Sequence, residues 1–237
     1  MLSIIIPAHN EGKIIKKTIN HLMPLLNDGE IIVVCDSCTD NTLEQAKHVK
    51  VKTITVNHQS AALTRNSGAE IASGDYLLFL DADTIIVDPN TIKKSIELLK
   101  NPNIKVIGSY WHTLETPPGC YIYNLLVNSF LYLTDTCPGF FLLCRKHEFI
   151  PFKTNDKNED VIWCKEMGRV YHLNGEVETS MRRLQKYGLF KTLQFYNQGQ
   201  SCDLFKSIIV MIMLFIIIII MITYIIFKFN ILTYCQQ

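Results

Sequence analysis

The sequence predicts an α/β protein with a doubly wound, mostly parallel sheet, followed by one C-terminal transmembrane helix. Over the first 112 residues, short β-branched runs alternate with helical patterns, which is typical of a parallel sheet covered by helices. Residues 207–227 contain no charged side chain, and as a helix they would extend about 31 Å, the thickness of a bilayer core. We therefore expect a folded domain at residues 1–200, a membrane span at 207–227 and a short tail at 228–237.

The expected elements of the first half follow one another in a regular order. Strands are expected at the apolar runs "LSIIIP", "EIIVVC", "VKTITV" and "YLLFL". Each is followed by a helical pattern: residues 12–26, a short helix from residue 41, residues 60–72, and residues 89–100, where Pro89 suits a first helical turn. The run "IKVIGSYWH" closes the series as a further strand.

The second half is less regular. It predicts a mostly apolar helix at "YIYNLLVNSFLYL", a buried strand at "GFFLLCR", a helix beginning at "NEDVIWCKEMG" and further strands at "RVYHL" and "GEVETS". The acids Glu159 and Asp160 fall in the first turn of the expected helix, where the helix dipole favours negative charge. Helix capping is therefore a simple explanation for these two acids.

Charge and cysteine usage restrict the class of protein and its location. Lys and Arg total 23 and Asp and Glu total 22, so no strong field directs the chain to nucleic acid. The N-terminal run "MLSIIIPAHNE" lacks the basic region of a signal peptide. The eight cysteines show no spacing typical of a disulfide framework, and we expect free thiols in a reducing compartment.

Charges around the apolar segment predict its orientation. Only Lys228 follows the segment, whereas five basic residues precede it: Arg182, Arg183, Lys186, Lys191 and Lys206. The positive-inside rule then places the large N-terminal domain in the cytoplasm. We expect a single-pass membrane protein.

Two acids, Asp81 and Asp83, follow directly on the apolar run that ends at Leu80. Two carboxylates so close together repel each other, and a divalent cation between them is the simplest compensation. Capping of the next turn is the alternative. In a parallel sheet, ligands bind beyond the C-terminal ends of the strands, and His9, Glu11 and Asp36 also lie at such ends. This convergence favours the cation.

The motifs, taken in order, resemble family 2 of the nucleotide-sugar-dependent glycosyltransferases, which have the GT-A fold. The residues that carry the resemblance are "SIIIPAHNE" (3–11), "IIVVCDSCTDNT" (31–42), "LTRNSGAEIASGDYLLFLDADT" (63–84) and "NED" (158–160). The similarity extends over roughly residues 1–200. The chain departs from the family at "CDSCTD", where the usual pattern is V-D-D-G-S-T-D. Cys35 and Cys38 on their own would allow a redox or zinc role, but no second pair follows, and the resemblance makes them part of a varied nucleotide loop.

The resemblance implies a role for each matching residue. On the donor side it assigns Pro7, His9 and Glu11 to the base and ribose, Asp36 to hydrogen bonding with the base, and Arg65 to the nucleotide. Asp81 and Asp83 match the D-x-D motif, whose first acid meets the ribose and whose second binds Mg²⁺ or Mn²⁺. Asp160 matches the general base.

Three functions remain open from the sequence. The leading one is a membrane-anchored inverting glycosyltransferase that moves a sugar from a nucleotide-sugar donor to a hydroxyl of a lipid-linked or envelope-glycan acceptor. Transfer to a polyprenyl phosphate is the second, although an ionised phosphate needs no general base. The third is a catalytically silent nucleotide-binding membrane adaptor.

Arg182 and Arg183 are expected to contact diphosphate or an anionic acceptor, or else lipid headgroups. His172 is either a further metal ligand or structural.

Overall fold

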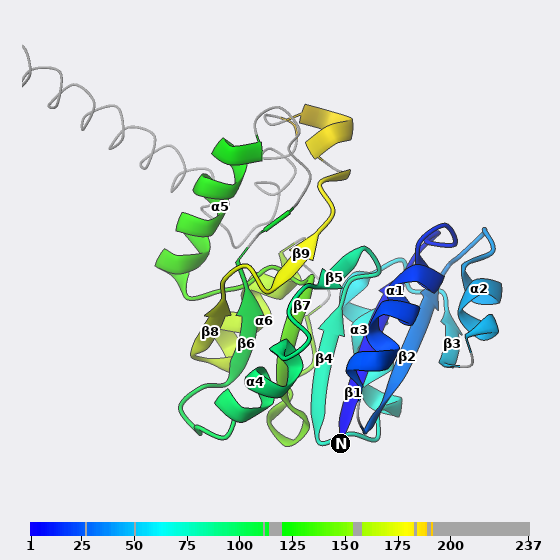
Figure 1. Cartoon of the computed structure of the whole chain (residues 1–237), viewed down its shortest axis with the longest axis horizontal. Coiled ribbons are helices and arrows are strands. Elements are labelled where there is room, and N and C mark those ends of the chain that lie inside the picture. Colours follow the sequence, from blue (N-terminus) through cyan, green and yellow to red (C-terminus); the bar gives the residue numbers. More distant parts are fainter. Residues whose placement is uncertain are drawn as a thin grey trace, which may run out of the picture.

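The computed structural model describes residues 1–188, except 27, 50, 111, 114–119, 154–157 and 183, together with residue 191. Its centre is a seven-stranded sheet with the strand order β3-β2-β1-β4-β7-β6-β8 (Figure 1). The strands are β1 Leu2–Ala8, β2 Gly29–Asp36, β3 Lys52–Val56, β4 Tyr76–Leu80, β6 Val106–Ser109, β7 Phe141–Arg145 and β8 Val170–Leu173. A separate ribbon pairs β5 Thr84–Ile86 with β9 Val177–Thr179.

The described helices connect these strands. They are α1 Ile15–Leu22, α2 Thr42–His48, α3 Ala61–Ile71, α4 Thr91–Leu98, α5 Cys120–Thr134 and α6 Glu159–Met167, with short 3₁₀ helices η1 Met23–Leu25 and η2 Lys146–Glu148. Strands β1 to β4 pair in parallel, which confirms the predicted α/β class and mostly parallel sheet.

Strand β1 lies inside the sheet and is covered on both faces. Ile4 packs in one apolar cluster with Ile15 and Ile19 of α1, whereas its neighbour Ile5 packs in a second cluster with the α3 residue Ala69. Alternate side chains of a strand point to opposite faces, so α1 and α3 cover the two faces. A continuous apolar run such as "SIIIP" is the sequence form of a strand buried in this way.

Close packing of α3 depends on its small residues. A Cβ atom at Gly68 would lie 2.3 Å from Ile5 Cγ2, too near for the helix to keep its place on the sheet. Ser60 caps the helix by accepting a hydrogen bond from the Leu63 N–H at 3.4 Å. The small residue at position 68 therefore lets α3 lie close against β1.

Four features differ from the sequence prediction. Strand β7 runs antiparallel to both β4 and β6, and the β5–β9 ribbon was not expected. Helix α1 is shorter than predicted because Pro24 lacks an N–H and the chain continues as η1. Pro89 precedes α4 rather than lying in its first turn, because Asp88 Oδ1 accepts the Asn90 N–H at 2.9 Å in a turn before the helix.

The apolar segment at residues 207–227 lies outside the described residues. Within the part of the chain that the structure describes, none of the helices has the length and apolar character that a membrane crossing requires.

Candidate active site

The ends of β1, β2 and β4 bring the predicted donor-side residues to one edge of the sheet. Ala8 of β1 is aligned with Cys35 of β2, so His9 and Asp36 follow at the same level. His9 Nδ1 lies 2.8 Å from the Asp36 carbonyl oxygen and joins the two strand ends. Pro7 is tolerated in β1 because pairing with β4 ends earlier, at Ile5.

Asp36 is the most heavily hydrogen-bonded carboxylate of this edge. Its oxygens accept hydrogen bonds from the N–H groups of His58, Gln59 and Ser60 and from the hydroxyls of Ser37 and Thr64, at 2.7–3.1 Å. Burial alone would raise the pKa of Asp36, but these donors outweigh burial and hold its pKa well below the usual range. Asp36 is therefore a fixed anion that organises the loop after β3. Its predicted contact with a nucleotide base stays a prediction.

The sequence did not reveal how the β1 and β2 loops are joined. Asn10 has a left-handed backbone (φ 57°), and its Oδ1 accepts the N–H groups of Thr39 and Asp40 at 2.8 and 3.3 Å. Asn tolerates this conformation better than most residues, so the "HN" pair after β1 was the signal that could have indicated it. Ser37 and Gln59 also have positive φ, both at 52°.

Arg65 connects the donor side to the region of the predicted base. Its guanidinium donates to Glu159 Oε1 at 2.9 Å and to Asp81 Oδ1 at 3.2 Å, and the side chain is 5 % exposed. Gly139 permits this approach, because a Cβ there would lie 2.6 Å from Arg65 Nη2. We expected Arg65 to face the nucleotide; in the structure it is committed to two carboxylates instead, and its direct nucleotide contact stays a prediction.

Asp81 and Asp160 are both carboxylates with raised pKa values in this cluster. Desolvation and the nearby Asp83 together raise the pKa of Asp81 to about 6, against the lowering effect of Arg65. Burial and the neighbouring Glu159 raise the pKa of Asp160 to about 7, again against Arg65. At neutral pH, Asp160 can therefore both accept and release a proton.

Helix capping accounts for only part of the contacts of Glu159 and Asp160. Asp160 Oδ1 accepts the Val161 N–H at 2.8 Å, within the first turn of α6. Its other oxygen accepts the N–H of Gly139, 21 residues away, at 2.6 Å. Glu159 turns to Arg65. The pair thus ties α6 to α3 and to the residues just before β7.

Arg182 places a cation beside the second acid of "DAD". Its guanidinium donates to both oxygens of Glu11 at 2.9–3.0 Å and to Asp83 Oδ2 at 2.7 and 3.1 Å. Glu11 and Asp83 thus converge on one positive group. Arg183, the other arginine expected here, lies outside the described residues.

This carboxylate pair fits a divalent cation. Among the described residues no three His, Cys, Asp or Glu side chains form a metal-binding group. Mg²⁺ in particular binds through one or two carboxylates together with substrate phosphates and water, and does not need an all-protein cage. Asp83, with Glu11 beside it, supplies carboxylate oxygens of the required kind at a position that already holds positive charge.

Three other features do not contribute to the site: His172, the cysteines Cys35 and Cys38, and a surface hollow. His172 Nε2 lies 2.9 Å from the Thr136 carbonyl oxygen, and its ring stacks on Tyr110 at 4.6 Å, which explains the residue structurally. Cys35 and Cys38 are free thiols, and Cys38 Sγ donates to the Ala8 carbonyl oxygen at 3.3 Å.

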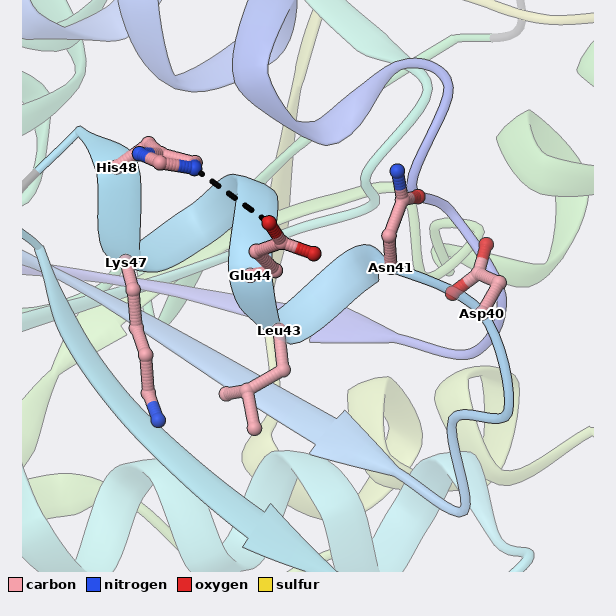
Figure 2. Close-up of a pocket in the computed structure, with 6 residues that line it drawn as sticks. All are labelled: Asp40, Asn41, Leu43, Glu44, Lys47 and His48. Atoms are coloured by element: carbon pink, nitrogen blue, oxygen red, sulfur yellow. Dashed lines mark ion pairs between the residues drawn. The ribbon is translucent and has the colours of Figure 1, made fainter.

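A surface hollow of about 490 Å³ lies on α2, and none of the residues that line it is a candidate site residue. Figure 2 shows the Glu44–His48 ion pair beside it, at 3.7 Å. It is lined by Asp40, Asn41, Leu43, Glu44, Lys47 and His48.

A mostly parallel sheet with acidic residues gathered beyond three strand ends defines a nucleotide-binding α/β domain of the GT-A type. The sequence profile described as "Glycosyl transferase family 2" matches residues 3–146. The chain belongs to this family, as its motifs predicted.

Curated relatives match part of the chain. It is 29 % identical over 131 residues to glycosyltransferase GlyG of Streptococcus pneumoniae, covering 52 % of this chain and 43 % of that protein. It is 36 % identical over 96 residues to the poly(ribitol-phosphate) beta-glucosyltransferase of Bacillus spizizenii, covering 36 % of this chain and 15 % of that protein. The chain thus spans less than half the length of these relatives.

Solved structures share the fold. Glucosyl-3-phosphoglycerate synthase from Mycobacterium tuberculosis, in complex with Mn²⁺, UDP and phosphoglyceric acid, has a TM-score of 0.61 and 18 % identity, covering 81 % of this chain and 75 % of that chain. Staphylococcus aureus TarS in complex with UDP-GlcNAc has a TM-score of 0.59 and 20 % identity, covering 83 % and 63 %.

Proposed function

We propose that this protein is an inverting glycosyltransferase that moves a sugar from a nucleoside diphosphate donor to a hydroxyl of a lipid-linked or cell-envelope glycan. The observation that carries the proposal is the Arg65 cluster. One buried guanidinium contacts Asp81 on the donor side and Glu159 beside Asp160. The donor-side acid and the proposed base therefore belong to one ion-pair network.

Each side chain has a defined task in this reaction. Asp36 and the loops around it hold the nucleotide. Asp83 holds Mg²⁺ or Mn²⁺, which when bound neutralises charge on the departing diphosphate. Asp160 removes the proton of the acceptor hydroxyl as that oxygen attacks the anomeric carbon. A single in-line displacement inverts the anomeric configuration.

Arg182 adds a second positive group to the donor side. Its guanidinium contacts Asp83, so a diphosphate beside Asp83 would lie next to it. Guanidinium matches phosphate oxygens in a bidentate fork. We propose that Arg182 exchanges its carboxylate partners for diphosphate oxygens when the donor binds.

Two findings support an acceptor in the cell envelope. Curated relatives include the poly(ribitol-phosphate) beta-glucosyltransferase of Bacillus spizizenii and the poly(ribitol-phosphate) beta-N-acetylglucosaminyltransferase TarP of Staphylococcus aureus. The uncharged segment 207–227 is long enough to anchor the chain in a bilayer. With the basic residues before this segment, the proposal places the catalytic domain on the cytoplasmic side.

The donor class can be tested by binding. Purified protein should show a raised melting temperature with one class of nucleotide-sugar and Mn²⁺, because a ligand that binds only the folded state stabilises it by mass action. The Asp83→Ala variant should lose the Mn²⁺-dependent part of the shift. The absence of any shift across UDP-, GDP-, ADP- and dTDP-sugars would contradict the proposal.

The location can be tested separately. Full-length protein should sediment with membranes and resist extraction with alkaline carbonate, and truncation after residue 200 should release it. Protease accessibility should place residues 1–200 on the cytoplasmic side. Release of the full chain by carbonate would contradict the proposed membrane anchor, but it would not contradict the proposed sugar transfer.

A further inference from the structure

Helix α5 has apolar side chains on two opposite faces. Its inner face is buried in a small apolar cluster, where Tyr123 and Leu131 pack with Met181 and Leu184. Its outer face carries four large side chains whose exposed fractions are 78 % for Tyr121, 60 % for Leu125, 72 % for Tyr132 and 68 % for Leu133. A helix on a water-exposed surface normally presents polar residues outward.

The outer residues form one surface. Tyr121, Leu125 and Tyr132 recur at the spacing of a single helix face, and Leu133 lies next to Tyr132. No residue of Cys120–Thr134 is charged. We call these four side chains the α5 outer face. Contiguous exposed apolar surface of this kind marks an interaction site in a folded protein.

The side chains themselves indicate the type of partner. Tyrosine is enriched where a membrane meets water, because its ring is apolar and its hydroxyl is polar. On the α5 outer face, one tyrosine lies near each end of the helix and a leucine lies between them.

Basic residues lie on the segment that packs under the same helix. Met181 and Leu184 contact the inner face of α5, and the exposed residues Lys186 and Lys191 follow along the chain. Lysines beside an apolar surface favour anionic lipid headgroups. Arg182 is not available for this purpose, because it pairs with Glu11 and Asp83.

The route of the chain provides an independent argument. The segment that packs on α5 leads, through residues 192–206, to the uncharged residues 207–227. Figure 1 shows α5 at the end of the molecule opposite α2 and β3. If residues 207–227 span the bilayer, the segment that packs on α5 belongs to the described part of the chain nearest in sequence to the span.

We propose that the α5 outer face lies on the lipid bilayer, in the headgroup region. The inference rests on the proposed membrane anchor and adds a second contact, which fixes how the domain is oriented on the membrane. With α5 as a second contact, the domain keeps one edge against the lipid, where a lipid-linked acceptor would arrive.

The test uses the full chain reconstituted into vesicles of phosphatidylcholine and phosphatidylglycerol, with and without brominated acyl chains. Tyr132→Trp and Leu125→Trp place reporters on the α5 outer face. Met23→Trp is the matched control, because Met23 is 51 % exposed and lies on the 3₁₀ helix η1, which directly follows α1. Emission of each variant is measured as the difference from the parent protein, which subtracts the native Trp111 and Trp163.

The proposal expects brominated lipid to quench the reporters of Tyr132→Trp and Leu125→Trp at least about twofold more than the reporter of Met23→Trp, since only an interfacial side chain approaches the acyl chains. Equal quenching in all three variants, in protein that floats with the vesicles, would overturn the α5 contact and leave the anchor standing. Protection from acrylamide without quenching by lipid would assign the face to a protein partner and also overturn it. Protein that fails to float would overturn the anchor and the α5 contact together.

Discussion

Asp36 on the donor side and Asp160 on the acceptor side are carboxylates withdrawn from water, yet their pKa values move in opposite directions. Asp36 accepts hydrogen bonds from five neighbouring residues, and these lower its pKa despite burial. Burial and the neighbouring Glu159 raise the pKa of Asp160 to about 7, and the two backbone N–H groups that it accepts, together with Arg65, offset only part of that rise. Whether such a carboxylate is a permanent anion or a proton acceptor depends on whether its hydrogen-bond donors outweigh burial and neighbouring negative charge, as they do at Asp36 and do not at Asp160.

The largest expected effect is at Asp83, whose carboxylate pairs with Arg182. Asp83→Ala should reduce sugar transfer by roughly 10⁴-fold or more, because metal stabilisation of the departing diphosphate contributes several kcal/mol. Transfer assays with Mn²⁺ titration measure this. Arg169→Gln, which alters an exposed residue on the surface, should keep normal activity. Full activity of the wild type in excess EDTA would contradict the role of the metal.

Asp160→Asn tests the acceptor half directly. Turnover should fall by roughly 10²–10⁴-fold, the usual contribution of a general base, while donor affinity stays close to that of the wild type. Single-turnover transfer at saturating donor, run beside a donor-binding titration, separates the two quantities. Near-normal turnover would remove Asp160 from the mechanism and favour a phosphate acceptor, which has no proton to lose.

The pH dependence of sugar transfer should differ from that of donor binding. Because Asp160 must be ionised to accept a proton, transfer should fall about tenfold for each pH unit below its pKa of about 7. Donor binding should stay level as pH falls from 7 towards 6, since Asp36 remains ionised and the donor-side Asp81 titrates only near 6. The raised pKa also means that ionisation costs stability, so the free energy of unfolding should decrease as pH rises through about 7. Asp160→Asn should remove this contribution and leave only that of Asp81, whose pKa is about 6. If sugar transfer instead began to fall only near pH 4, the pKa assigned to Asp160 would be contradicted.

Asp36→Asn should act on stability and donor binding rather than on proton transfer. The amide turns an N–H₂ group toward donors that need an acceptor, which costs about 1–3 kcal/mol of unfolding free energy. Denaturant unfolding and donor titration measure the two consequences. If turnover at saturating donor fell as far as in Asp160→Asn, the distinction between the two carboxylates would not hold.

Thr64→Val gives the smallest expected change. It removes one of the donors to Asp36, the hydroxyl at 2.7 Å from Oδ2, and should lower the free energy of unfolding by about 1 kcal/mol. Thr64→Ser keeps the hydroxyl and should restore most of the loss. An equal loss in both variants would assign the effect to packing rather than to the hydrogen bond.

The donor half could be predicted from sequence because its signals are local. The runs before His9, Asp36 and Asp81 are short, apolar and continuous, and each ends in a polar residue. Parallel pairing then brings these ends to one edge. The acceptor half depends on contacts between distant residues. Nothing near Phe141 indicates that β7 runs antiparallel between β4 and β6, and nothing near Arg65 indicates that its partner is Glu159, 94 residues away.

Arg182 also has a consequence for the order in which the site is made. Its partners lie 171 and 99 positions earlier in the chain, at Glu11 and Asp83. A ribosome adds roughly 5–20 residues per second, so for several seconds the new chain presents both carboxylates without their arginine. During that interval the two carboxylates lack the positive partner that they have in the complete fold. The last part of the domain to be synthesised is therefore the part that neutralises the first.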